Sequence, residues 1–169
     1  PLETDQPATD RCGSCTRCLE ACPTEALVAP GVLDARRCLS YLTIELRGDV
    51  PEEFHAAMGS QIYGCDICQD VCPWNRGVEK RRAGETGPAD AEPHVSLVDW
   101  LEAGDEELAA RYDRLFVPRN DPRYLRRNAL VALGNSGGEP GPAQPYARGD
   151  EPLLREQAEW ALARIGERA

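Results

Sequence analysis

Apolar residues recur at helical spacing in the second half of the chain. Four of them stand at positions i, i+4, i+7 and i+8 of one segment: Leu125, Ala129, Ala132 and Leu133. The same order returns 29 residues later, in Leu154, Ala158, Ala161 and Leu162. Such a face is one that a helix buries against a neighbour, and repeated helices of this kind stack side by side. The pattern therefore predicts a small all-α domain of HEAT-like repeats over residues 94–169.

Turn-forming residues interrupt this pattern. The stretch GNSGGEPGPAQP separates the two repeats, and we expect a flexible connection there, with Gly134 as the C-cap of the first helix. Residues 76–93 are rich in glycine, proline and charge, and we expect a linker over 79–93. This linker would separate residues 1–78 from the helical domain.

Shorter patterns occur in the first half. Within residues 33–47 (LDARRCLSYLTIELR), Leu39, Leu42 and Leu46 lie at helical spacing, which predicts helical structure with Cys38 at its start. The segment PEEFHAAMG predicts a short helix that ends at Gly59. His55 and His94 stand alone, without the spacing of metal ligands, and we assign both to packing or to the surface.

Composition narrows the class of protein. The 169 residues carry a net charge of −10, and 41% are apolar but only 6% aromatic. Such a composition makes an ordinary core thin, so something else is expected to stabilise part of the chain. No apolar run reaches about 18 residues, and no signal peptide pattern is present, which indicates a cytoplasmic protein without a transmembrane helix. Because the chain begins at Pro1 rather than methionine, we expect a piece of a longer protein or a processed product.

A local basic segment stands out in this acidic chain. Residues 111–127 hold six arginines against two aspartates. Arginine guanidinium groups suit phosphate, and Arg123, Arg126 and Arg127 fall within one to two helical turns. The segment is either an RNA-backbone platform or a solvated helix face with ion pairs.

The cysteines carry the strongest signal. All eight lie between Cys12 and Cys72. The first four form C-x2-C-x2-C-x3-C followed by proline, the run of bacterial ferredoxins that bind [4Fe–4S] clusters. Zinc ribbons use two separated C-x2-C pairs instead. A secreted disulfide scaffold is disfavoured because no signal peptide precedes the cysteines.

A second run repeats the first with one change. Cys65, Cys68 and Cys72 give C-x2-C-x3-C followed by proline, and Ile62 stands where another cysteine would be expected. Cys38 is left over and is assigned the vacant ligand position. In two-cluster ferredoxins the last cysteine of a run ligates the other cluster. This rule predicts a first cluster held by Cys12, Cys15, Cys18 and Cys72, and a second held by Cys22, Cys38, Cys65 and Cys68. The first half is therefore predicted to be a two-[4Fe–4S] ferredoxin-like domain, and the whole chain an α+β protein.

Longer motifs carry a family resemblance. The run CGSCTRCLEACPTEALVAPGVLDARRCLSYLTIELRGDVPEE, the later GSQIYGCDICQDVCPWNR, and RRNALVALGNSG with LLREQAEWAL resemble epoxyqueuosine reductase. The resemblance implies an oxidoreductase that reduces epoxyqueuosine to queuosine at the tRNA wobble position, with cobalamin and two [4Fe–4S] clusters. It also implies that the cobalamin domain with the proton donor lies outside this chain. The chain alone is then expected to have no turnover and no catalytic residue.

The same resemblance implies roles for individual residues. Those expected to face cobalamin are Ser40, Tyr41, Gly64, Asp66 and Ile67. Those expected to contact tRNA are Arg47, Arg123, Arg126 and Arg127. The resemblance further suggests a monomer.

Three other functions stay open on the sequence. A two-cluster ferredoxin module that serves another reductase would explain the cysteines but not the helical tail. A cobalamin reductase of the dehalogenating kind also has two clusters but predicts neither the repeats nor the arginines. The third is a helical-repeat RNA-binding module stabilised by metal.

Overall fold

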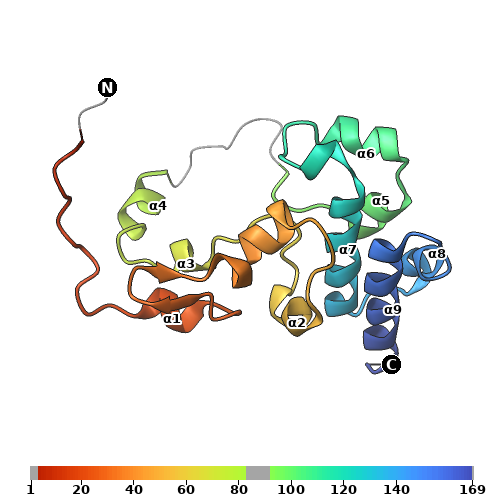
Figure 1. The fold of residues 1–169 in the computed structure, drawn as a ribbon, viewed down its shortest axis with the longest axis horizontal. Coiled ribbons are helices and arrows are strands. Elements are labelled where there is room, and N and C mark those ends of the chain that lie inside the picture. Colours follow the sequence, from red (N-terminus) through yellow and green to blue (C-terminus); the bar gives the residue numbers. More distant parts are fainter. Residues whose placement is uncertain (1–3, 83–91, 169) are drawn as a thin grey trace.

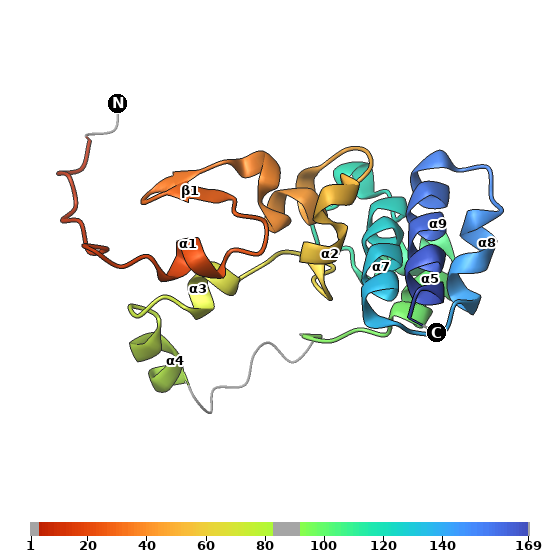
Figure 2. The same cartoon turned by 90° about the horizontal axis from the view of Figure 1, so that it is seen from below.

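The structure is a computed structural model that describes residues 4–82 and 92–168. The cysteine-bearing half and the helical tail lie next to each other along the long axis of the molecule (Figures 1 and 2). Among the described residues the only sheet is an antiparallel pair of β1 (Leu27–Ala29) and β2 (Val32–Leu33), with Leu27 opposite Leu33. The fold is thus rich in helices and poor in sheet.

The cysteine-bearing half consists of short elements. Its α-helices are α1 (Arg17–Ala21), α2 (His55–Met58), α3 (Ile67–Asp70) and α4 (Arg76–Arg82). Two 3-10 turns, Ala35–Arg37 and Glu52–Phe54, and a π-helical turn, Tyr41–Glu45, complete it. The expected short helix before Gly59 is confirmed, since Glu52–Phe54 leads into α2 and Gly59 ends it with a φ of 55°.

The helical segment expected to start at Cys38 is confirmed, since residues 39–45 are helical. Cys38 has extended backbone, with φ −71° and ψ 126°, and separates the 3-10 turn from the π-helical turn. Leu39 and Leu42 of this segment are buried, at 2% and 1% exposure. The apolar spacing therefore indicated correctly both the helical turns after Cys38 and the side chains that they bury.

Residues 92–168, the described part of the tail, contain five α-helices. They are α5 (Leu97–Glu102), α6 (Asp105–Arg111), α7 (Arg123–Ser136), α8 (Gln144–Ala147) and α9 (Pro152–Gly166), with 3-10 turns at Pro118–Asn120 and Gly141–Ala143. Helices α7 and α9 lie side by side (Figures 1 and 2). They run in the same direction, because Arg123 bonds Glu151 at their N-terminal ends and Arg168 bonds the Asn135 carbonyl at their C-terminal ends.

The apolar repeat sits at the contact between these two helices. Leu125, Ala129, Leu154 and Ala158 all belong to the buried core of the tail. Gly134, however, is not the helix cap that the sequence suggested. It lies inside α7, and the cap is Gly137, whose φ of 67° is left-handed. Gly134 is required for another reason: a Cβ there would meet Trp160 Cζ3 at 2.7 Å and Ala161 Cα at 2.9 Å.

Gly134→Ala is therefore expected to destabilise the tail. Forcing a methyl group against backbone in a packed contact costs about 1–3 kcal/mol, more than the gain of up to about 1 kcal/mol from alanine's helix propensity. Urea unfolding followed by circular dichroism measures the difference. The matched control is Gly166→Ala in α9, where nothing lies within 4 Å of the new Cβ. Equal stability of the two variants would contradict the close approach.

Helix α7 also joins the tail to the other half. Val131 of α7 belongs to a buried cluster with Leu39, Leu42 and Met58 of the cysteine-bearing half. The expected linker over 79–93 overlaps α4 at its start, and residues 83–91 lie outside the described residues. The two halves thus share one core although a long segment separates them in sequence.

His55 is part of the same contact. It is 3% exposed, its Nε2 donates to the Val50 carbonyl at 2.8 Å, and its ring meets Trp160 of α9 edge-on at 4.5 Å. Its Nδ1 is buried and has no hydrogen-bond partner among the described residues. Burial lowers the pKa of His55 below 6.5, although Asp49 and Glu52 act in the opposite direction. The assignment of His55 to packing agrees with this position.

We expect the chain to lose stability as the pH falls below about 6.5. The unfolded His55 binds a proton near pH 6.5, whereas the folded one binds it only at lower pH, so acid favours unfolding by up to about 1.4 kcal/mol per pH unit. Urea unfolding at pH 7.5 and 5.5 tests this. His55→Gln should flatten the dependence, and His94→Gln, at the exposed second histidine, is the matched control. Parallel pH profiles for all three proteins would refute the assignment.

Candidate metal centres

One cavity gathers the N-terminal cysteines. It measures about 210 Å³ and lies between α1 and α3, which pack against each other. The cysteines that line it are Cys12, Cys15, Cys18, Cys68 and Cys72. Trp74 also lines it and is tied to the N-terminal segment, because its Nε1 donates to the Arg11 carbonyl at 2.9 Å. The cavity therefore contains all four cysteines expected for the first cluster, contributed by both cysteine runs.

A second cavity of about 400 Å³ gathers the remaining cysteines. Those that line it are Cys22, Cys38, Cys65 and Cys68, together with Ser40, Asp66 and Ile67. All four cysteines expected for the second cluster are present. Cys68 lines both cavities, so the two sites are neighbours.

The donor set fits iron–sulfur clusters better than single ions. All eight cysteines are free thiols. Within residues 4–82 and 92–168, no group of three or more His, Cys, Asp or Glu side chains closes tightly enough to hold one metal ion. A tetrahedral zinc site needs four ligand atoms within about 2.3 Å of one point. Cysteines spread around a cavity instead suit a larger inorganic group, and two clusters of four irons use eight thiolates.

The surroundings of Cys22 and Cys65 shift the pKa values of these two thiols in opposite directions. The Ala26 N–H donates to Cys22 Sγ at 3.2 Å, and the Thr24 hydroxyl lies 3.6 Å from the same sulfur. Burial alone would raise the pKa of Cys22, but these bonds outweigh it and lower that pKa. Burial, with the neighbouring thiols, raises the pKa of Cys65. Donors to sulfur favour the thiolate form, which is the form that binds iron.

The residues expected to face cobalamin either line the second cavity or are next in sequence to residues that line it. Ser40, Asp66 and Ile67 line it, as noted above, and the Ser40 hydroxyl bonds Cys65. Gly64 has a φ of 78°, a left-handed conformation that glycine accepts without strain. Tyr41 is exposed on the π-helical turn next to Ser40. The structure brings all five near one cavity.

Sequence reasoning missed Thr43 in this region. Its hydroxyl is buried, donates to the Leu39 carbonyl at 2.7 Å and accepts from the Gly64 N–H at 2.9 Å. The signal available was the spacing of Ser40 and Thr43, three residues apart and so on one side of a helical turn.

Two of the arginines expected to contact tRNA are interior residues, and that expectation is wrong for them. Arg126 is 4% exposed and bonds Asp105 and the Ala103 carbonyl. Arg127 is 0% exposed and donates to the carbonyls of Leu42, Leu46 and Gly48. These guanidinium groups are out of reach of a phosphate.

The other two arginines are at the surface. Arg123 is exposed but is held by Asp121 and Glu151, which raise its pKa. Arg47 is exposed and forms no ion pair within the described part of the chain. Of these four arginines, only Arg47 is thus both exposed and without a carboxylate partner among the described residues, as suits a residue that binds phosphate.

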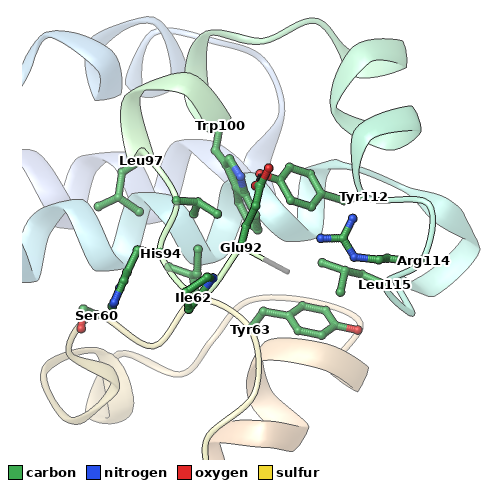
Figure 3. Close-up of a pocket in the computed structure, with 12 residues that line it drawn as sticks. Ser60, Ile62, Tyr63, Glu92, His94, Leu97, Trp100, Tyr112, Arg114 and Leu115 are labelled. Atoms are coloured by element: carbon green, nitrogen blue, oxygen red, sulfur yellow. Dashed lines mark hydrogen bonds between the residues drawn. The ribbon is translucent and has the colours of Figure 1, made fainter. Parts of the chain in front are cut away.

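A third cavity contains no cysteine. It measures about 440 Å³ and lies where residues 60–63 meet the tail. Figure 3 shows Ile62 and Tyr63 on one side of it and Trp100 and Tyr112 on the other. The Tyr63 hydroxyl donates to the Phe116 carbonyl at 2.8 Å. The segment before Cys65 is therefore held against the tail.

Comparison with known proteins agrees with this geometry. Residues 11–75 match a family model described as a 4Fe-4S double cluster binding domain, which confirms the expected pair of clusters. The epoxyqueuosine reductase of Vibrio cholerae is 41% identical over 164 residues, covering 96% of this chain and 44% of that protein. The corresponding Bacillus subtilis protein is 37% identical and covers the whole chain. The chain is homologous to the epoxyqueuosine reductases.

Solved structures of epoxyqueuosine reductases share the fold. A crystal structure described as epoxyqueuosine reductase with a tRNA-Tyr epoxyqueuosine-modified stem loop superposes with a TM-score of 0.81 at 37% identity. The superposition covers 98% of this chain and 45% of the chain in that crystal structure. The Bacillus subtilis epoxyqueuosine reductase gives a TM-score of 0.79 at 36% identity. The chain therefore spans less than half the length of the relatives it matches. No helix among the described residues is long and apolar enough to cross a membrane.

Proposed function

We propose that this chain is the cluster-binding and RNA-contacting portion of an epoxyqueuosine reductase, an oxidoreductase that converts epoxyqueuosine to queuosine in tRNA. The observation that carries the proposal is the pair of neighbouring cavities that together are lined by all eight cysteines, with Cys68 shared by both. The choice of reaction is supported by similarity to epoxyqueuosine reductases over nearly the whole chain.

The cysteines have distinct tasks in this proposal. Cys12, Cys15, Cys18 and Cys72 bind the first cluster, and Cys22, Cys38, Cys65 and Cys68 bind the second. Two such clusters transfer one electron at a time, and cobalamin supplies the chemistry at the epoxide. Because Ser40, Asp66 and Ile67 line the second cavity, they are proposed to lie on the cobalamin side, with Tyr41 and Gly64. The proton donor is not assigned to any residue of this chain.

The helical tail is proposed to be HEAT-like and to carry part of the RNA surface. Helices α7 and α9 are parallel and repeat one apolar pattern, as stacked repeats do. Arg47 is the arginine proposed to contact phosphate. Arg123 of the tail would have to leave Asp121 and Glu151 before it could bind phosphate. The whole protein is proposed to act as a monomer in the cytoplasm.

A free-standing ferredoxin is the weaker alternative. Helix α7 places Arg127 and Asn128 inside the cysteine-bearing half, where both are 0% exposed. A separable electron carrier would not need buried polar contacts to an RNA-binding tail. The tail is thus an integral part of the cluster-bearing unit.

Metal analysis after anaerobic purification tests the proposal. About eight irons and eight acid-labile sulfides per chain are expected, with a visible absorption band that bleaches with dithionite. Zinc in place of iron, without such a band, would overturn the electron-transfer role. About four irons would contradict the place given to Cys38.

Arg47→Gln is expected to weaken binding of a queuosine-type tRNA anticodon arm. Loss of one phosphate contact should make the slope of log affinity against log salt shallower by about 0.7–0.9. Fluorescence anisotropy with a labelled stem loop at several salt concentrations measures this. Arg148→Gln, at an exposed arginine of the tail, removes the same charge and should have a smaller effect. Identical slopes for Arg47→Gln and the unmodified chain would exclude Arg47 as a contact.

A further inference from the structure

Four consecutive residues, Ile62 to Cys65, are fixed by other parts of the chain, and the last of them is a proposed ligand of the second cluster. The Ile62 carbonyl accepts from Asn128 Nδ2 at 2.9 Å, and the Tyr63 hydroxyl donates to the Phe116 carbonyl at 2.8 Å. The Gly64 N–H donates to Thr43 Oγ1 at 2.9 Å. The Cys65 N–H donates to Ser40 Oγ at 3.1 Å. Figure 3 shows the first two of these residues against the tail.

Asn128 connects two of these supports. Its Nδ2 also donates to the Thr43 carbonyl at 2.7 Å, so one amide group bonds the π-helical turn and the 62–65 segment together. Its Oδ1 accepts from the Arg127 guanidinium at 2.9 and 3.0 Å, which fixes the orientation of the amide. Asn128 is 0% exposed, so water does not replace these bonds. Both segments that it joins lead directly to the second cavity.

We propose that Asn128 of helix α7, acting through Thr43, is a positioning residue for the second [4Fe–4S] cluster. It sets the distance between Ser40 and Thr43 on one side and Gly64 and Cys65 on the other. The potential of such a cluster depends on hydrogen bonds to its sulfurs and on solvent access, both of which follow the position of the ligand segment. The tail thereby adjusts the cluster to which it makes no direct ligand bond. The inference rests on the proposed function, because it requires that both clusters bind.

The test compares two asparagines of the same helix. Asn135 also donates from α7 to carbonyls of the cysteine-bearing half, at His55 and Gly59, but it does not bond the 62–65 segment. Asn128→Ala and Asn135→Ala therefore each remove two hydrogen bonds from α7 to backbone carbonyls of the cysteine-bearing half. Only Asn128→Ala removes a bond to the 62–65 segment, which contains Cys65. Thr43→Val is a second variant, close in shape and equal in charge, for the case that Asn128→Ala does not fold.

The measurement is an electron paramagnetic resonance titration of the cluster-loaded chain, with iron counted per chain. Asn128→Ala and Thr43→Val should retain the iron. At the potential where the second cluster of the unmodified chain is half reduced, both variants should change the ratio of reduced to oxidised second cluster severalfold. The first cluster should titrate unchanged. Asn135→Ala should lower stability and leave both titrations as they are.

Each outcome decides a different claim. Failure of the unmodified chain to bind iron and sulfide would refute the proposed function. Full iron content in Asn128→Ala and Thr43→Val, with both clusters titrating as in the unmodified chain, would refute only the positioning role. An equal change in all three variants would also refute it, since Asn135 has no bond to the ligand segment.

Discussion

Replacing Arg127 by methionine is expected to destabilise the chain by about 3 kcal/mol or more. Its guanidinium donates to three backbone carbonyls of the cysteine-bearing half, at 2.6–2.9 Å. Each buried acceptor left without a donor costs about 1–3 kcal/mol, and the removal of a buried charge offsets only part of the sum. Burial lowers the pKa of Arg127 to about 10, so the group is still charged at neutral pH.

The measurement is urea unfolding followed by circular dichroism, together with limited proteolysis. Loss of Arg127 should also increase cleavage between the halves, because its bonds join α7 to the end of the π-helical turn. Arg123→Met on the same helix is the control. Its ion pairs are exposed, and pairs of that kind contribute about 1 kcal/mol or less. Equal stability of the two variants would show that Arg127 does not join the halves.

Arg127 also shows where sequence reasoning ends. The run of arginines indicated local positive charge, and a charged residue is rarely buried without a carboxylate partner. Its acceptors are the carbonyls of Leu42, Leu46 and Gly48, about eighty positions away in the chain. Every residue has a backbone carbonyl, so the sequence does not show which carbonyls will accept hydrogen bonds from an arginine. Only the folded arrangement distinguishes a buried docking arginine from an exposed phosphate ligand.

The buried faces and the cysteine sets were more accessible to prediction. Apolar spacing identified Leu125, Ala129 and their partners in α9 because burial follows helix periodicity directly. Gly134 was misplaced because glycine serves both helix ends and close helix contacts, and the sequence does not distinguish these uses. Motif spacing reflects the geometry of the ligated group itself, and each predicted cysteine set lines one cavity, although Cys68 lines both.

The second large effect is expected from single cysteine-to-alanine variants. Cys72 follows Cys65 and Cys68 in sequence but lines the cavity of Cys12, Cys15 and Cys18. Because a [4Fe–4S] cluster is held by four thiolates, we expect that removing one prevents its cluster from assembling, so that iron falls from about eight to about four per chain. Cys72→Ala should therefore lose the same cluster as Cys12→Ala.

Cys22 gives the reciprocal case, since it lines the cavity of Cys38 and Cys65 rather than that of its neighbour Cys18. Cys22→Ala and Cys65→Ala should both show the electron paramagnetic resonance spectrum of the first cluster alone. Cys12→Ala and Cys72→Ala should both show that of the second cluster alone. Ser14→Ala, at an exposed position between two ligands, should retain both signals. If Cys72→Ala instead leaves the spectrum of Cys65→Ala, each run binds its own cluster and the halves of the site do not cross. If the ligands cross as predicted, neither cluster can form until both cysteine runs are in place, and cluster binding itself would stabilise a domain with few aromatic residues.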